Sequence, residues 1–199
     1  MKIILASKSP RRKEILSIIT EDFEIMSEEV DERQIEESVL KAGGDAEQVQ
    51  KELAKKKAAA VFDSLSDEQK SEAVVIGADT SVVCDGQIMG KPVDKNDARR
   101  MLLMLCGKTH EVITGVCVKT KDEETVFTEV TLVRFGEPDE YQRDLIERYI
   151  NTDEPYDKAG AYGIQQGGAL LVETVEGDYF NVVGLPARKL SLVLSKFEI

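Results

Sequence analysis

Several features that define common protein classes are absent from this sequence. Its 199 residues include no tryptophan, one histidine and three cysteines. The single histidine, His110, allows neither a His-rich metal site nor a His-based triad, and a lone histidine near a strand start is more often structural than catalytic. Cys84, Cys106 and Cys117 are odd in number and show no paired spacing. We therefore expect reduced thiols in a cytoplasmic protein.

Long apolar runs and several catalytic motifs are also missing. No stretch of about 18 apolar residues occurs, so we expect no membrane-spanning helix. The N-terminus has no basic segment followed by an apolar one, so we expect no secretory signal. There is no GxxxxGK loop, no GxGxxG after the first strand, no GxSxG, no CxxC and no HExxH. The sequence therefore lacks the motifs that usually indicate a P-loop kinase, a dehydrogenase, a serine hydrolase or a zinc protease.

Positive charge is scarce, with 26 Lys and Arg against 38 Asp and Glu, a net charge of -12. Such a protein is a poor general binder of nucleic acid or of anionic membranes, because that affinity comes from basic side chains that neutralise phosphates. A polyanionic ligand must meet a local basic site or arrive with a metal ion. The length and the apolar fraction of 42% predict one soluble domain over residues 1–199.

Two arginines nevertheless stand at the start of the first predicted helix. The apolar residues 2–6 predict a buried strand, and Ser9-Pro10 is typical of a helix start. Backbone N–H groups on this strand-to-helix turn, together with Arg11 and Arg12, form a possible anion site. The alternative is a solvated helix face.

A second stretch, residues 73–92, places a carboxylate beside the core. The run "VVIGA" predicts a buried strand that ends at Asp79. Ligands of open α/β sheets bind at the carboxyl ends of strands, so Asp79 stands where a ligand or catalytic residue would stand. An aspartate in an ordinary turn is the alternative.

The rest of the chain alternates between helical and strand patterns. Helices are expected over residues 46–65, 94–105, 138–150 and 184–197, and strands near 22–25 and over 110–120 and 124–135. Residues 154–172 predict a glycine-bearing loop that runs into a strand. The run Lys55-Lys56-Lys57 is most simply surface charge.

Acidic and basic residues in glycine-marked loops carry the remaining chemistry. They are Glu32, Asp79, Asp157, Arg11, Arg12, Lys57, Lys91 and Lys158. Carboxylates with water ligands suit Mg²⁺ or Mn²⁺, and arginine and lysine suit phosphate oxygens. These residue types favour metal-assisted attack of water on a phosphoryl group.

Longer motifs show that the chain resembles the Maf family of nucleoside triphosphate pyrophosphatases. In chain order, they are "LASKSPRRKEIL", "EVDE", "LAKKKAAAV", "GADTSVVCDGQIMGKP", "HEVITGV", "EPYDKAGAYGIQ" and "GDYFNVVGLP". They cover nearly the whole chain. The resemblance implies an α/β fold with an elongated mixed sheet, flanking helices and two lobes around a central cleft, as in Maf and ITPase-like proteins, often as a homodimer.

The resemblance also implies an activity and a set of site residues. Maf-like proteins cleave nucleotides between the α and β phosphates, give a monophosphate and pyrophosphate, and need a divalent cation. The family's proton acceptor corresponds to Asp79. Its phosphate and metal residues correspond to Ser7, Arg12, Glu32, Lys57 and Lys91, of which we expect Glu32, with Asp79, to hold the metal.

Three positions favour the dTTP/UTP subgroup over the 7-methyl-GTP subgroup. They are Arg11, Thr80 and Gln165, where the other subgroup has an aromatic residue, glutamine and glutamate. Gln165 offers both a donor and an acceptor, as a pyrimidine edge requires. One departure is Gln166, where the family more often has glycine.

Two other functions remain open. One is a pyrophosphatase for another nucleotide such as CTP. The other is a nucleotide-sensing regulator of cell division or septum formation. The presence of Asp79, Glu32, Lys57 and Lys91 favours catalysis over binding alone, and Arg11, Thr80 and Gln165 favour dTTP and UTP.

Overall fold

The computed structural model describes residues 1–197. Its strands are β1 (Lys2–Leu5), β2 (Phe23–Ile25), β3 (Ala73–Cys84), β4 (Gln87–Met89), β5 (Thr109–Lys119), β6 (Glu124–Phe135) and β7 (Val172–Glu176). Its α-helices are α1 (Pro10–Ile19), α2 (Glu32–Lys41), α3 (Ala46–Ser64), α4 (Asp67–Glu72), α5 (Lys95–Leu105), α6 (Glu140–Tyr149), α7 (Tyr179–Val183) and α8 (Ala187–Leu194). Three short 3₁₀ helices are η1 (Glu154–Asp157), η2 (Ala159–Ala161) and η3 (Gln166–Leu171).

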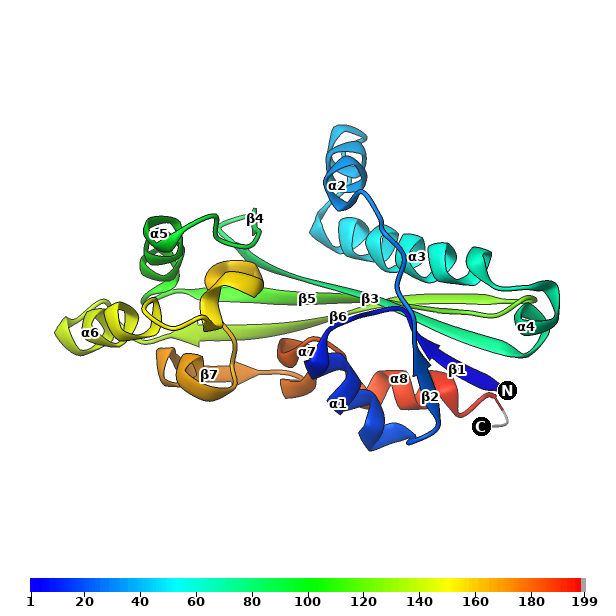
Figure 1. Ribbon diagram of the computed structural model, residues 1–199. Helices are drawn as coiled ribbons and strands as arrows, with labels where there is room; N and C mark the ends of the chain where they lie inside the picture. Colours follow the sequence, from blue (N-terminus) through cyan, green and yellow to red (C-terminus); the bar gives the residue numbers. More distant parts are fainter. Residues whose placement is uncertain (198–199) are drawn as a thin grey trace. The chain divides into compact units, whose positions relative to one another are not determined.

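The strands form one mixed sheet in the order β2-β1-β3-β5-β6-β7, with β4 paired to β3 (Figure 1). β1 pairs in parallel with both β2 and β3, whereas the pairs β3–β4 and β6–β7 are antiparallel. The expected mixed α/β sheet with flanking helices is confirmed.

The start of α1 follows the local signal in the sequence. Ser9 is the N-cap residue, and its side chain accepts a hydrogen bond from the backbone N–H of Arg12. Pro10 occupies the first helical position, where its missing N–H costs no hydrogen bond. The predicted helix start is confirmed.

The predicted end of β3 at Asp79 is wrong, because the strand continues to Cys84. Its first half pairs with β1 as far as the register Leu5↔Ile76. Its last residues pair with β4, starting from Val82↔Met89. Beyond Asp79, the backbone of β3 therefore has a new strand partner, β4. Asp79 itself lies within β3, just past the end of its parallel pairing with β1.

The chain divides into two compact units. The first unit comprises residues 1–79, 114–129 and 184–199, and the second comprises residues 80–113 and 130–183. β3, β5 and β6 each contribute residues to both units. The expected single functional domain over residues 1–199 and the expected cleft stay predictions.

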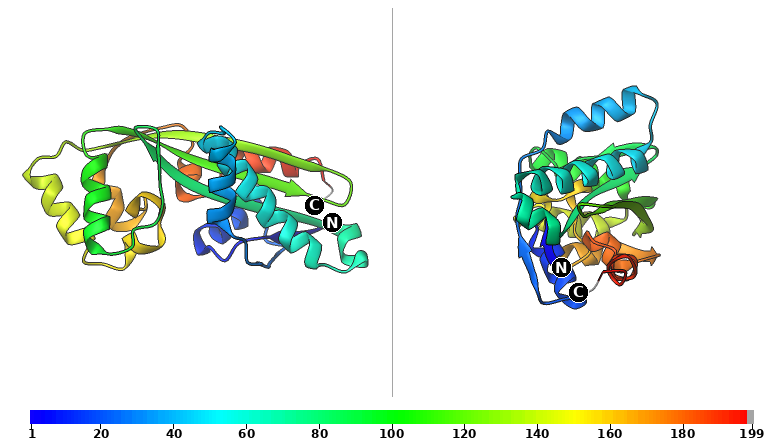
Figure 2. Two further views of the ribbon diagram at one scale, coloured as in Figure 1. Left: turned by 90° about the horizontal axis from the view of Figure 1, so that it is seen from above. Right: turned by 90° about the vertical axis from the view of Figure 1, so that its right-hand side faces the viewer.

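In the first unit, helices cover both faces of the sheet. α3 runs along one face, and α1 and α8 pack together on the other (Figures 1 and 2). α3 lies unusually close to the strands at two glycines. A Cβ atom at Gly77 would lie 2.3 Å from the carbonyl oxygen of Ala54, and one at Gly115 would lie 2.2 Å from that of Gln50. The missing side chains therefore let the helix backbone approach β3 and β5.

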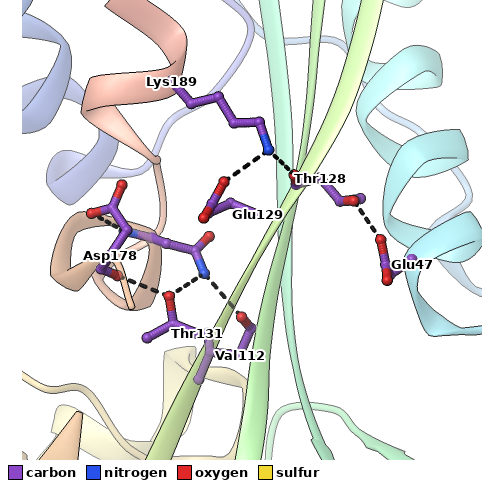
Figure 3. Close-up of polar contacts among 8 residues, drawn as sticks. Glu47, Val112, Thr128, Glu129, Thr131, Asp178 and Lys189 are labelled. Carbon is purple, nitrogen blue, oxygen red and sulfur yellow. Dashed lines mark hydrogen bonds and ion pairs between the residues drawn. The ribbon is translucent and has the colours of Figure 1, made fainter. Parts of the chain in front are cut away.

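Polar side chains fix β6 within each unit (Figure 3). In the first unit, the Lys189 ammonium on α8 donates to the carbonyl of Thr128 at 2.7 Å, and the Thr128 hydroxyl donates to Glu47 of α3 at 2.6 Å. In the second unit, the Asn181 amide donates to the carbonyl of Val112 at 2.9 Å and to the Thr131 hydroxyl at 3.0 Å. The "GDYFNVVGLP" motif, which includes Asn181, thus contributes scaffold contacts.

The cysteines and the histidine lie inside the fold. Cys84, Cys106 and Cys117 are free thiols and buried, and burial raises the pKa of each, that of Cys117 to about 12. His110 is 2% exposed. Within residues 1–197, no helix is both long enough and apolar enough to span a membrane.

Candidate active site

Lys57 joins two carboxylates in the first unit. Its ammonium nitrogen lies 2.5 Å from an Asp79 oxygen and 2.6 Å from a Glu32 oxygen. The side chains of Lys57 and Asp79 are each 16% exposed, whereas that of Glu32 is 54% exposed. The interpretation of Lys57 as surface charge is therefore wrong, because this lysine turns inward toward β3.

The close approach of α3 to β3 explains why Lys57 reaches Asp79. Gly77 lies two residues before Asp79, and a Cβ atom there would lie 2.6 Å from the backbone nitrogen of Ala58. Lys57 precedes Ala58 on the same helix. The backbone of α3 therefore packs directly against β3 beside Asp79. The side chain of Lys57 reaches the carboxylate because the two backbones are so close.

Glu32 reaches the same ammonium from another element. It is the first residue of α2, and the preceding residue, Asp31, caps this helix by accepting from the N–H of Gln34 at 2.9 Å. The "EVDE" motif is thus a helix start, which our sequence analysis did not predict. The structure brings the two expected metal ligands, Glu32 and Asp79, to one cationic group.

Arg12 points into its own unit and bonds to backbone carbonyls. Its Nε donates to the carbonyl of Gly184 at 2.9 Å, and its Nη1 donates to that of Ala78 at 2.8 Å. Burial lowers the pKa of Arg12, and the nearby Asp79 carboxylate opposes this effect. Arg12 therefore fixes the backbone that immediately precedes Asp79, a role that our sequence analysis did not predict.

Ser7 belongs to the same network. It is 8% exposed, and its hydroxyl accepts from the backbone N–H of Ser9 at 3.2 Å and from Arg12 Nη1 at 3.4 Å. The strand-to-helix turn is thereby held in shape. The phosphate-binding roles of Ser7 and Arg12 stay predictions, and both side chains have structural contacts as well.

The other expected site residues are divided between the two units. Arg11 lies in the first unit, on the first turn of α1 and half-buried, whereas Thr80, Lys91 and Gln165 lie in the second. Lys91 is exposed and follows β4. Within the second unit, the turn that precedes Lys91 is tied to the loop before Gln165, because the N–H of Gly160 donates to the carbonyl of Gly90 at 3.0 Å.

Gln166 has a backbone conformation that glycine adopts more readily. Its φ angle is 53°, in the left-handed region that L-residues rarely occupy. A glycine at this position, which the family resemblance leads us to expect, would adopt the same conformation without strain. Gln166 itself is exposed, and its backbone directly follows Gln165.

The donors for a metal ion are few. Within residues 1–197, no group of three or more His, Cys, Asp or Glu side chains lies close enough to hold a metal. Glu32 and Asp79 already converge on one cation, the Lys57 ammonium, and carboxylate oxygens suit Mg²⁺ and Mn²⁺. This pair therefore fits a hydrated divalent ion that takes its other ligands from water or substrate.

Two carboxylates face one lysine beside the half-buried Arg12, and this arrangement suits a charged, oxygen-rich ligand. Comparison with known proteins identifies the family. Residues 2–197 match the family described as Maf-like protein. The chain belongs to the Maf family. The resemblance inferred from its motifs is therefore confirmed.

Curated relatives align with nearly the entire chain. A dTTP/UTP pyrophosphatase of Thermosipho africanus is 49% identical over 95% of this chain and 90% of its own length. Proteins of the same name from Acetivibrio thermocellus and Bacillus cereus are 48% and 43% identical, and each match covers 100% of this chain and 96% of the relative. Among solved structures, the Staphylococcus aureus Ham1 protein is a weak match, with a TM-score of 0.41 at 12% identity over 69% of this chain and 73% of that one.

Proposed function

We propose that this protein hydrolyses dTTP and UTP, and related modified pyrimidine nucleotides, to the nucleoside monophosphate and pyrophosphate. The observation that carries the proposal is the convergence of Asp79 and Glu32 on Lys57, in a chain whose full-length relatives are named dTTP/UTP pyrophosphatases. Two carboxylates and one ammonium group are the kinds of group that phosphoryl hydrolysis uses to activate water and to bind metal and phosphate.

In this mechanism, Asp79 accepts the proton of the attacking water. Hydrolysis forms one P–O bond to that water, breaks the P–O bridge between the α and β phosphates, and releases pyrophosphate. The position of Asp79 supports this role, because Arg12 donates to the carbonyl of the preceding residue, Ala78, and so fixes the backbone that carries the carboxylate. A general base needs this fixed position relative to the water.

A divalent cation, Mg²⁺ or Mn²⁺, is the proposed cofactor. When bound, it would polarise the phosphate oxygens and neutralise their charge. Glu32 and Asp79 would hold it, and Lys57, released from one or both carboxylates, would turn to a phosphate. Ser7, Arg12 and Lys91 are the other proposed phosphate ligands.

Base selection is assigned to Arg11, Thr80 and Gln165. Gln165 is half-buried, and its amide makes no hydrogen bond within residues 1–197. Its donor and acceptor are therefore available to the edge of a pyrimidine. We further propose a cytoplasmic homodimer that uses neither nucleic acid nor a membrane, in line with the buried free thiols and the net charge of -12.

Product analysis tests which bond is broken. The protein is incubated with dTTP and Mg²⁺, and the nucleotides are separated by anion exchange. We expect dTMP and pyrophosphate in equal amounts. Release of dTDP and inorganic phosphate would overturn the assignment, and binding without any product would favour a nucleotide sensor.

A further inference from the structure

A hydrogen bond between His110 and Tyr162 is buried within the second unit. The His110 Nε2 atom is 2.7 Å from the Tyr162 hydroxyl, and the two side chains belong to residues that are 2% and 5% exposed. Both rings pack edge to face against Phe135, with ring centroids 5.2 Å and 4.8 Å away. The pair is therefore held in one orientation by the apolar core.

The pair is poorly suited to proton transfer near neutral pH. Burial lowers the pKa of His110 to about 4 and raises that of Tyr162, so both groups stay neutral. The His110 Nδ1 atom is buried without a hydrogen-bond partner in the described chain. Burying these polar groups lowers the stability of the fold. A directional contact that fixes the neighbouring segment is a role that explains why such a pair is present.

Tyr162 lies three residues before Gln165, in a segment with an unusual backbone. Gly160 and Ala161 have φ angles of 67° and 62°, and Gln166 has one of 53°. Left-handed residues thus stand on both sides of Gln165. Such conformations persist where the surrounding contacts determine them.

Further contacts hold this segment within its unit. The N–H of Gly163 donates to the Tyr149 hydroxyl at 3.2 Å. A Cβ atom at Gly168 would lie 2.0 Å from the carbonyl oxygen of Gly163, so the chain folds tightly on itself around Gln165. The Tyr162 hydroxyl provides a side-chain anchor in this segment that reaches the strand β5.

We propose that His110 and Tyr162 are positioning residues for base selection, acting through the Gln165 amide. This proposal rests on the proposed function, in which Gln165 contacts the pyrimidine. The His110–Tyr162 bond fixes the backbone of residues 162–165, and the amide of Gln165 is thereby aimed at the base. Loss of the bond lets the amide swing and weakens discrimination between thymine and cytosine.

The test compares kcat and KM for dTTP and dCTP in three variants, His110→Phe, Tyr162→Phe and the double variant. The expected result for each is a roughly tenfold loss of discrimination in kcat/KM, carried by a higher KM for dTTP with kcat little changed. Tyr156→Phe is the matched control, because it also removes a tyrosine hydroxyl bond in this unit, to the carbonyl of Ile150 at 2.8 Å. It should keep the wild-type discrimination.

Comparison of the Tm with the discrimination between dTTP and dCTP distinguishes a positioning role in base selection from a purely structural role. Each single variant leaves one buried polar group without its partner, whereas the double variant removes both. We expect the Tm of the double variant to recover toward that of the wild type while its discrimination stays low. Recovery of both together would overturn the proposal.

A Gln165→Ala background provides the second check. If the pair acts through Gln165, His110→Phe should cause no further loss of discrimination there. An undiminished additional loss would overturn the proposal. If the wild-type protein hydrolyses neither nucleotide, the proposed function fails. The discrimination between dTTP and dCTP is then measured in the wild type and the variants as a ratio of Kd values by calorimetry. Equal Kd values for dTTP and dCTP in the wild type would then overturn the positioning role too.

Discussion

The ammonium of Lys57 lies 2.5 Å from the carboxylate of Asp79, and each side chain is 16% exposed. One partner comes from a helix and the other from the middle of a strand, 22 residues further along the chain. Gly77 permits the contact because it lets the two backbones approach each other.

Replacement of Asp79 by asparagine keeps the size of the side chain and removes its capacity to accept a proton. We expect turnover of dTTP to fall by about 10²- to 10⁴-fold, the usual contribution of a general base, while the protein stays folded. Steady-state kinetics with circular dichroism as the folding control measures this. Unchanged turnover would remove Asp79 from the role of proton acceptor.

In the proposed site, a metal ion would have to compete with the Lys57 ammonium for the carboxylates of Glu32 and Asp79. Lys57→Met leaves two carboxylates facing each other and should lower stability by a few kcal/mol, as expected when one partner of a mostly buried ion pair is removed. Mn²⁺ should then raise the Tm of the variant more than that of the wild type. Thermal unfolding with and without Mn²⁺ checks this, and an equal shift in both proteins would place the ion elsewhere.

Arg12→Ala removes two hydrogen bonds to backbone carbonyls as well as a positive charge. We expect a higher KM for dTTP and a loss of stability of about 2 kcal/mol or more, since unpaired buried carbonyls are costly. Arg12→Lys is the matched variant, because lysine keeps the charge but lacks the fork that spans two carbonyls. If Arg12→Lys restores Tm completely, the carbonyl contacts to Ala78 and Gly184 do not contribute to stability.

Gly77→Ala tests the close approach of α3. The added methyl group would meet the backbone of Ala54 and Ala58 at 2.3 and 2.6 Å, so the helix must shift. We expect a destabilisation of about 1–3 kcal/mol and a loss of turnover, because Lys57 moves with the helix. Gly90→Ala is the control for stability, since no atom lies within 4 Å of its added Cβ. Equal Tm values for the two variants would contradict this explanation.

Stability should decrease in mildly acidic solution because of His110. Its pKa is lowered from 6.5 to about 4 in the fold, so between these values the unfolded chain binds more protons than the folded one. The free energy of unfolding should therefore fall by about 3 kcal/mol as the pH drops from 7 to 4. Urea titrations at several pH values measure the slope. It should be much shallower in His110→Phe, and an equal slope would assign the effect to other groups.

Local signals in the sequence predict the elements well. Ser9 and Pro10 mark the start of α1 by their own chemistry, and the alternating runs give β5 and β6 nearly to the residue. The short helices α2, α4 and α7 were not predicted. α4 contains no apolar residue at all, so it has none of the apolar periodicity that reveals a helix.

The contacts of the candidate site are non-local, and the sequence pattern does not reveal them. Lys57 lies in a run of three lysines, and nothing local distinguishes the one that turns inward. Arg12 bonds to Gly184, 172 residues away. The continuation of β3 past Asp79 depends on pairing with β4, which is a tertiary preference. The family resemblance nevertheless pointed to Asp79, Glu32 and Lys57 together. Gly77, a glycine inside an apolar strand, was the available signal for close packing.

A pyrophosphate-release assay of the purified protein, with Mg²⁺ and then Mn²⁺, tests the central claim most directly. The substrates are dTTP, UTP, CTP, dCTP, GTP, 7-methyl-GTP and modified pyrimidine nucleotides. We expect selective release of pyrophosphate from dTTP and UTP. Preference for a purine nucleotide, or no release by folded protein from any nucleotide, would contradict it.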